Sequence, residues 1–242
     1  MVEPLSITAS SIDAGLLALP WSTPLDEWKS DHIVSLPKGL SRHLVRFANL
    51  SGRVVAVKET TGEMARREYE MLGMLARLDV PCVSRVAVID GRRTPKGEPL
   101  PAALVTAHLK FSLPYRALFT QTLRPDTAGR LVDALAALLV RLHTVGFFWG
   151  DVSLSNILFR RDAGEFAAYL VDAETAEMHE ALTNGQRAHD LSIATINLYG
   201  EFCDLEAGQL LDASLDPAKL VESILTRYRE LWAELTGVEE FS

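Results

Sequence analysis

The sequence predicts an α+β fold of two lobes, in which a β-rich lobe with one helix precedes a mainly helical lobe. Short apolar runs separated by turn residues occur at 33–59, 86–89 and 102–109, and such runs are typical of strands. Apolar residues at helical spacing occur over 127–145 and 191–235. We therefore expect the chain to be β-rich first and helical afterwards.

The lobe boundaries follow from this order. We expect an N-terminal extension at residues 1–32, a first lobe at 33–109 and a second lobe at 110–242. Trp21 and Trp28 are large aromatic residues within the extension, so it is expected to pack on the domain rather than to form a free tail.

Turn and cap residues set the bounds of the predicted elements. Residues 49–52 lie between two apolar runs and predict a β-hairpin. The long helix at 127–145 is expected to begin at a cap, Asp126. The other predicted features are a helix over 62–78, strands at 157–159 and 167–171, and helical breaks near Gly200 and Pro217.

Composition limits the classes of function. Of the 242 residues, 48% are hydrophobic and 23% are charged, which is ordinary for a globular protein. The net charge of −8 argues against an extended nucleic-acid surface or a polybasic membrane surface. No apolar run has the length of a membrane span. Cys82 and Cys203 lack metal-ligand spacing and are expected to be buried free thiols, which predicts a cytoplasmic location.

A lysine at the end of an apolar strand is the first candidate for chemistry. Lys58 follows the run 55–57, and a lysine in this context contacts ATP phosphates when an acidic residue on the next helix holds it. Glu68 falls on the apolar stripe of that helix, whereas Glu70 shares a face with arginines. Because a buried carboxylate is costly unless it is paired, Glu68 is the predicted partner. Taken alone, such a lysine is more often a surface residue.

The second candidate is a loop in which Asp151 precedes Asn156 by five positions. In a kinase catalytic loop of this spacing, the aspartate accepts the proton of the acceptor hydroxyl and the asparagine binds magnesium. The bare spacing arises by chance about once in a chain of this size. The prediction of a catalytic loop therefore depends on the position of this segment, which follows a long apolar helix and precedes a strand.

The third candidate, Asp172, follows the second strand of the next predicted hairpin. Positions 156 and 172 average to 164, so a hairpin centred on Gly164 would place Asn156 opposite Asp172, with Cβ atoms about 5 Å apart. Two oxygen-donating side chains at this distance suit Mg²⁺. A slip of one residue in the register would separate them.

Residues 35–43 lie between the first two predicted strands, where a phosphate-covering loop would stand. Gly39, Ser41 and Arg42 are candidates for nucleotide contacts through backbone N–H groups and side chains. The segment holds a single glycine, so an ordinary turn explains it equally well.

The order of these motifs resembles the protein-kinase-like superfamily over residues 33–200. It is nearest to the bacterial lipopolysaccharide-kinase-like branch and to the aminoglycoside and choline phosphotransferases. The residues that carry the resemblance are Lys58, Glu68, Asp151, Asn156 and Asp172.

The resemblance implies a two-lobed protein-kinase-like fold with ATP and Mg²⁺ as cofactors. It implies that Asp151 is the catalytic base and that Asn156 and Asp172 hold the metal. The backbone from Ala107 to Leu109 would meet adenine. Asp190 would brace the catalytic loop, although a helix N-cap explains this residue equally well.

The sequence also departs from the pattern of the peptide kinases. Trp149 and Gly150 replace the His-Arg pair before the catalytic aspartate, which puts control by activation-loop phosphorylation in doubt. Ser153 stands where those kinases carry lysine and small-molecule kinases often carry histidine. Stabilisation of the γ-phosphate would then be weaker or come from elsewhere.

Three functions remain open from the sequence. The first is transfer of the γ-phosphate of Mg·ATP to a hydroxyl of a small molecule such as a sugar. The second is a nucleotide-binding pseudokinase that regulates or scaffolds a protein partner, and the third is nucleotidyl transfer to a protein. The acceptor itself is not predicted, because acceptor pockets lie in variable segments.

Overall fold

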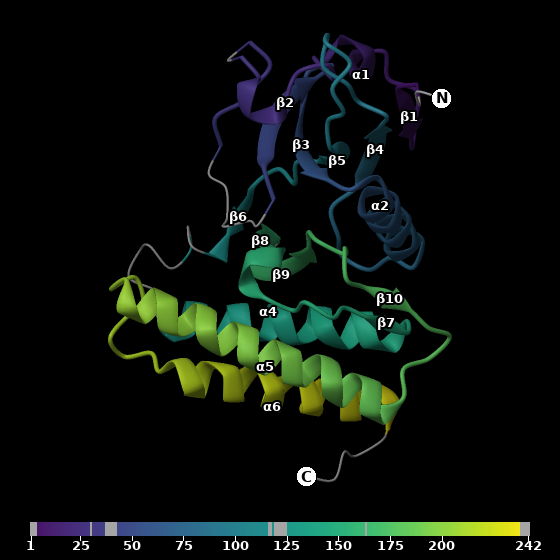
Figure 1. Ribbon diagram of the computed structural model, residues 1–242. Helices are drawn as coiled ribbons and strands as arrows, with labels where there is room; N and C mark the ends of the chain where they lie inside the picture. Colours follow the sequence, from purple (N-terminus) through teal and green to yellow (C-terminus); the bar gives the residue numbers. More distant parts are fainter. Residues whose placement is uncertain are drawn as a thin grey trace. The chain divides into compact units, whose positions relative to one another are not determined.

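The computed structural model describes residues 4–29, 31–36, 43–115, 118, 125–162 and 164–237. Two compact units contain them, one drawn from Met1–Ala76 and Val83–Lys110 and the other from Arg77–Cys82 and Phe111–Ser242. The first unit is β-rich and the second is mainly helical, so the predicted α+β fold class is confirmed (Figure 1).

A five-stranded antiparallel sheet forms the first unit, in the order β1-β4-β5-β3-β2. Its strands are β1 (Ser6–Ala9), β2 (Val45–Leu50), β3 (Arg53–Thr60), β4 (Arg85–Asp90) and β5 (Ala102–Ala107). The predicted hairpin joins β2 to β3 through Ser51 and Gly52, whose φ angles are +50° and +81°. Two left-handed residues are what a tight two-residue hairpin turn requires. The sequence did not predict β1.

The two faces of this sheet are covered by different parts of the chain, because side chains alternate along a strand. Val55 and Val57 of β3 belong to the core cluster that includes residues of the N-terminal segment. Leu104 of β5 belongs to a second cluster, which is formed with helix α2 (Gly62–Arg77). Lys58 lies opposite Leu104 in the sheet, so its side chain points to the face that α2 covers.

Residues of the N-terminal segment share a core cluster with the sheet. It contains a short helix, α1 (Gly15–Ala18), and a 3₁₀ turn, η1 (Leu25–Glu27). The rings of Trp21 and Trp28 meet edge to face with centroids 5.3 Å apart, and both side chains are buried.

A buried arginine, which sequence reasoning missed, ties this segment to the sheet. Arg92 pairs with Glu59 at 2.7 Å and also donates to the carbonyl oxygens of Trp21, Thr23 and Pro101.

The second unit is built on three long helices, α4 (Pro125–Thr144), α5 (Asn184–Ala207) and α6 (Pro217–Thr236). Helix α6 packs against both α4 and α5, and the three lie side by side in Figure 1. Short strands complete the unit: β6 (Ser112–Pro114), β8 (Ile157–Asp162) and β9 (Glu165–Leu170) form one sheet, and β7 (Phe147–Phe148) pairs with β10 (Glu177–Met178). Among the helices of the described ranges, none has the length and apolar character of a membrane span.

Two predicted helix features are wrong. Helix α4 begins at Pro125, which places Asp126 within its first turn rather than at its cap. Helix α5 begins after a capping box formed by Thr183 and Gln186, and it continues through Gly200 without a break. A glycine costs a helix about 1 kcal/mol relative to alanine, and burial of the apolar face of α5 outweighs that cost.

The predicted register of the second hairpin is also wrong by one residue. Ile157 pairs with Leu170, so Val171 rather than Asp172 comes opposite Asn156, and the Val171 N–H donates to the Asn156 carbonyl at 3.0 Å. The prediction centred the hairpin on Gly164, but the connection has two residues, and Gly164 provides its left-handed position with φ of +96°. Asn156 and Asp172 are therefore not a cross-strand pair.

Candidate active site

The first unit pairs Lys58 with Glu68. The Lys58 Nζ lies 2.5 Å from Glu68 Oε2, and the side chains are 11% and 2% exposed. Strand alternation sends Lys58 toward α2, and the helical spacing of Ala65, Glu68 and Leu72 sends the carboxylate inward. Glu70, the alternative partner, is exposed. A buried carboxylate needs such a cation, because burial alone strongly disfavours its charge.

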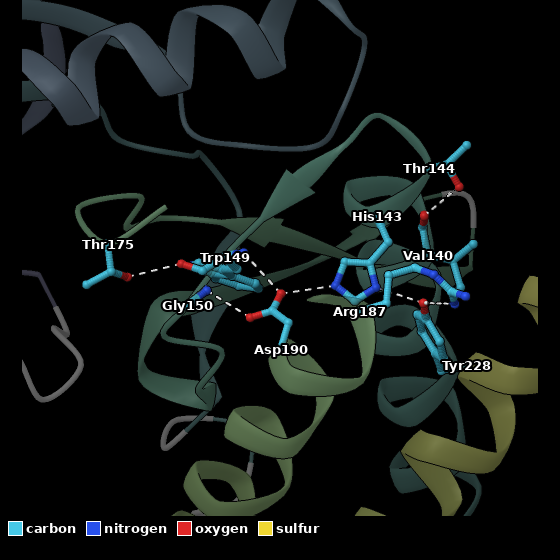
Figure 2. Close-up of polar contacts among 9 residues, drawn as sticks. All are labelled: Val140, His143, Thr144, Trp149, Gly150, Thr175, Arg187, Asp190 and Tyr228. Atoms are coloured by element: carbon cyan, nitrogen blue, oxygen red, sulfur yellow. Dashed lines mark hydrogen bonds and ion pairs between the residues drawn. The ribbon is translucent and has the colours of Figure 1, made fainter. Parts of the chain in front are cut away.

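The backbone of the predicted catalytic loop in the second unit is fixed by Asp190 of α5 (Figure 2). The Trp149 N–H donates to Asp190 Oδ2 at 3.0 Å, and the Gly150 N–H donates to Oδ1 at 2.8 Å. Asp190 is fully buried and lies inside α5, so the alternative interpretation of this residue as an N-cap is wrong.

A buried polar chain supports Asp190 from the other side (Figure 2). His143 Nε2 lies 3.0 Å from Asp190 Oδ2, and its Nδ1 lies 2.7 Å from the Tyr228 hydroxyl. Asp190 Oδ2 also accepts the Trp149 N–H, so the His143 ring and the loop backbone meet at one carboxylate oxygen. The three long helices thus share one hydrogen-bonded network behind the loop.

Trp149 and Gly150, which replace the His-Arg pair of the peptide kinases, each have a structural role. The Trp149 indole N–H donates to the Asp172 carbonyl at 2.8 Å, and its own carbonyl accepts from the Thr175 hydroxyl. Gly150 has φ of +75°, a left-handed conformation in which a side chain would be strained. Trp149 therefore joins the loop to the segment that carries Asp172.

Two asparagines hold the carboxylate of Asp151. Asn156 Nδ2 lies 3.1 Å from Asp151 Oδ2, and Asn197 Nδ2 lies 3.2 Å from Asp151 Oδ1. Asn156 also donates to the Asp151 carbonyl at 3.0 Å. The structure therefore brings Asp151 and Asn156 together, and it adds Asn197, which sequence reasoning missed.

Glu201, also missed, holds the far end of the loop. It accepts from the backbone N–H of Leu154 at 2.5 Å and of Ser155 at 3.0 Å. Burial raises the pKa of the Glu201 carboxyl, hydrogen bonds from Ser155 and Leu154 partly oppose this, and the Asp151 carboxylate adds to it. The one signal that could have found Asn197 and Glu201 is their spacing from Asp190, which puts all three on one face of a helix.

Asp172 is held in place by its neighbours in the same unit. Its Oδ1 accepts from the Glu174 N–H at 3.0 Å, and its carbonyl accepts from Trp149. Asn156 uses its amide nitrogen on Asp151, so its amide oxygen is the atom it can offer to a cation. A carboxylate and an amide oxygen are hard ligands of the kind that Mg²⁺ takes, and the assignment of Asn156 and Asp172 to a metal stays a prediction.

The remaining predicted residues concern the nucleotide. The N–H of Ala107 donates to the Ser84 carbonyl at 2.8 Å and that of His108 to the Val54 carbonyl at 3.0 Å, so strand pairing already occupies these donors. The adenine contact of Ala107 and Leu109 stays a prediction. Gly39, Ser41 and Arg42 lie outside the described residues.

The cysteines take no part in the site. Cys82 and Cys203 are not joined in a disulfide, and both are half-buried rather than buried as predicted. Burial raises the pKa of the Cys82 thiol to about 11, which keeps it neutral and unreactive at physiological pH.

Comparison with known families decides the identity of this arrangement. Residues 53–199, which include Lys58, the catalytic-loop candidates and Asp190, match the model of the Lipopolysaccharide kinase (Kdo/WaaP) family. The chain belongs to this family. As a member of the Kdo/WaaP family it is a kinase-like phosphotransferase. A search of curated protein sequences found no match.

Solved structures agree on the fold of this Kdo/WaaP family member. A structure described as WaaP in complex with acyl carrier protein is 17% identical, with a TM-score of 0.50 over 88% of this chain and 91% of that one. An aminoglycoside-3'-phosphotransferase of type VIII is 15% identical, with a TM-score of 0.53 over 86% of this chain and 88% of that one. At these identities the likeness shows the protein-kinase-like fold alone.

Proposed function

We propose that this protein transfers the γ-phosphate of Mg·ATP to a hydroxyl group of a small molecule such as a sugar. The observation that carries the proposal is the carboxylate of Asp151, which amide donors hold by both oxygens on a loop whose backbone is fixed at Trp149 and Gly150. An oriented carboxylate on a rigid loop is suited to accept the proton of an attacking hydroxyl.

The proposal assigns each role in this reaction to a named side chain. Asp151 accepts the hydroxyl proton as the oxygen attacks the γ-phosphorus. The bond between that phosphorus and the bridging oxygen of the β-phosphate breaks, and ADP leaves with the bond's electron pair. Lys58, held by Glu68, neutralises phosphate charge. Asn156 and Asp172 would hold Mg²⁺, which when bound neutralises charge on the phosphates. Trp149 keeps Asp172 in register with the loop, because its indole N–H binds the Asp172 carbonyl.

The acceptor class is inferred from the family. The family is named for lipopolysaccharide kinases, so we propose a sugar hydroxyl as the acceptor. One solved structure is of WaaP in complex with acyl carrier protein. This supports, as a further proposal, a protein partner for the present chain.

One observation favours a second candidate, the nucleotide-binding pseudokinase. Ser153 is buried, and its hydroxyl lies 3.1 Å from that of Ser155. In the resemblance described above, peptide kinases carry lysine at this position and small-molecule kinases often carry histidine. The loop then lacks this means of stabilising the γ-phosphate. Weak or absent turnover with intact nucleotide binding would be its signature.

The experiment compares the unmodified chain with Asp151→Asn. We expect the unmodified protein to release ADP from Mg·ATP faster when a mixture of monosaccharides or lipopolysaccharide sugars is added. Asp151→Asn keeps size and polarity but removes the base, so turnover should fall by about 10²–10⁴-fold. Affinity for Mg·ATP should change by less than about tenfold, or about 1.4 kcal/mol. Full turnover in Asp151→Asn would disprove the role of this residue, and ATP binding without any turnover would favour the pseudokinase.

A further inference from the structure

One face of α5 carries three polar side chains that all bind the loop 149–155. Asp190, Asn197 and Glu201 are separated by seven and four positions, a spacing that places them on one side of a helix. Asp190 binds the start of the loop and Glu201 binds its end, both through backbone N–H groups.

Asn197 differs from the other two because it reaches a side chain. Its amide nitrogen lies 3.2 Å from Asp151 Oδ1 and also 3.2 Å from the Val152 carbonyl. A single NH₂ group can make both bonds, since it carries two hydrogens. Asn197 therefore fixes the carboxylate of Asp151 relative to the backbone one residue further on.

We infer that Asn197 is a positioning residue that sets the orientation of the Asp151 carboxylate, an inference that rests on the proposed function. The terminal torsion of an aspartate is broad, so a lone carboxylate samples many orientations. Asn156 holds one oxygen and Asn197 holds the other, which defines the plane of the group. Each oxygen has a further lone pair, so the carboxylate can still accept the hydroxyl proton.

An asparagine suits this position better than a charged donor. A lysine or arginine beside Asp151 would stabilise the carboxylate as an ion and make it a weaker base. The amide orients the group by hydrogen bonding without adding a charge. Replacement by aspartate would keep the size of the side chain but turn the donor into an acceptor that repels Asp151.

The first test is a swap of the two side chains. Asn197→Asp should lower the urea midpoint of unfolding at pH 7, because two carboxylates would then face each other. The double variant Asp151→Asn/Asn197→Asp should recover most of this loss, since the pair regains one donor and one acceptor. Ser192→Asp is the matched control, because it adds the same charge at an exposed position of the same helix.

The second test measures catalysis on the same variants. A misplacement of about 1 Å can cost about 10²-fold in rate, so we expect Asn197→Ala to lower kcat for ADP release from Mg·ATP by about ten- to a hundredfold. Asn197→Asp should be worse than Asn197→Ala, KM for Mg·ATP should stay unchanged in both, and Ser192→Asp should match the unmodified chain. The swapped double variant should be stable yet inactive, because it lacks the base.

The outcomes separate this inference from the proposed function. Two results together support the positioning role. The urea midpoint recovers in the double variant, and kcat falls from the unmodified chain to Asn197→Ala and again to Asn197→Asp. Additive losses of stability, or full kcat in Asn197→Asp, overturn it while the proposed function stands. No turnover in the unmodified chain overturns the proposed function, and the positioning role falls with it.

Discussion

Glu68 is a carboxylate on the apolar stripe of α2, and only 2% of its side chain is exposed. The energetic consequence is that Lys58 and Glu68 depend on each other. Breaking a buried ion pair by removing one partner is far more costly than replacing both by apolar groups.

We therefore expect Lys58→Met to lower the free energy of unfolding by about 3–5 kcal/mol, because it removes the cation that Glu68 faces. The double variant Lys58→Met/Glu68→Leu should recover most of this loss while nucleotide binding stays impaired. Urea denaturation measures the first effect and calorimetric titration with Mg·ATP the second.

Arg66→Met provides the control for that measurement. Arg66 pairs with Asp90, but the two side chains are 57% and 29% exposed. Loss of an exposed pair should cost less than about 1 kcal/mol. Equal losses for Lys58→Met and Arg66→Met would contradict the assignment of Lys58 and Glu68 as a buried, mutually dependent pair.

The residues predicted from sequence are those whose local pattern reveals their environment. Lys58 follows the apolar run 55–57, and Glu68 interrupts an apolar stripe, so both positions can be recognised in a short stretch of sequence. Asn197 and Arg92 are polar residues whose partners lie far away in the sequence, Asp151 for the first and Glu59 for the second. No local periodicity indicates such partners, so only the fold reveals them.

Among the elements, α5 has the largest part in shaping the candidate site, since its side chains bind the loop at three points. Burial raises the pKa of Glu201 on this helix above its ordinary value of 4.5. A carboxyl with a higher pKa in the folded state holds its proton more tightly there. Its contribution to stability is fully present below pH 4.5 and is lost as the pH rises through the raised pKa.

This sign leads to a prediction about pH. As the pH rises from below 4.5 through the raised pKa, the unmodified chain should lose stability that Glu201→Gln, which does not titrate at this position, keeps. The free energy of unfolding of the variant minus that of the unmodified chain should therefore increase. Urea denaturation across this range measures the difference, and Glu206→Gln, at an exposed position of α5, corrects for general charge effects. A difference that stays constant, or moves toward the unmodified chain, would show that burial of Glu201 does not set its titration.

Element types were predicted well, and their bounds and register less well. The hairpin at 49–52 follows from local turn chemistry, and the turn indeed holds two left-handed residues. The register of β8 and β9 depends on whether their connection has an even or odd number of residues, which a single glycine does not specify. Strand β1 was missed because it pairs with β4, about eighty positions away, in a segment without strong alternation.

At the scale of the whole molecule, charge is the property that bears most on nucleotide binding. The chain carries a net charge of −8, so its overall field repels a highly anionic nucleotide. Lys58 already faces a carboxylate, which reduces the positive charge it offers. Binding should therefore depend on a cation that accompanies the nucleotide.

We expect the affinity for ATP to fall by more than about tenfold, or about 1.4 kcal/mol, when EDTA removes Mg²⁺. Asp172→Asn should weaken binding of Mg·ATP and make it less dependent on Mg²⁺, because it removes a charged ligand from the proposed metal site. Asp204→Asn makes the same change of charge at an exposed position of α5 and should leave the dependence intact. Isothermal titration with and without EDTA measures all three proteins. If the unmodified chain binds ATP equally well in EDTA, the assignment of Asn156 and Asp172 to the metal fails, because a negatively charged chain would then hold the nucleotide by protein contacts alone.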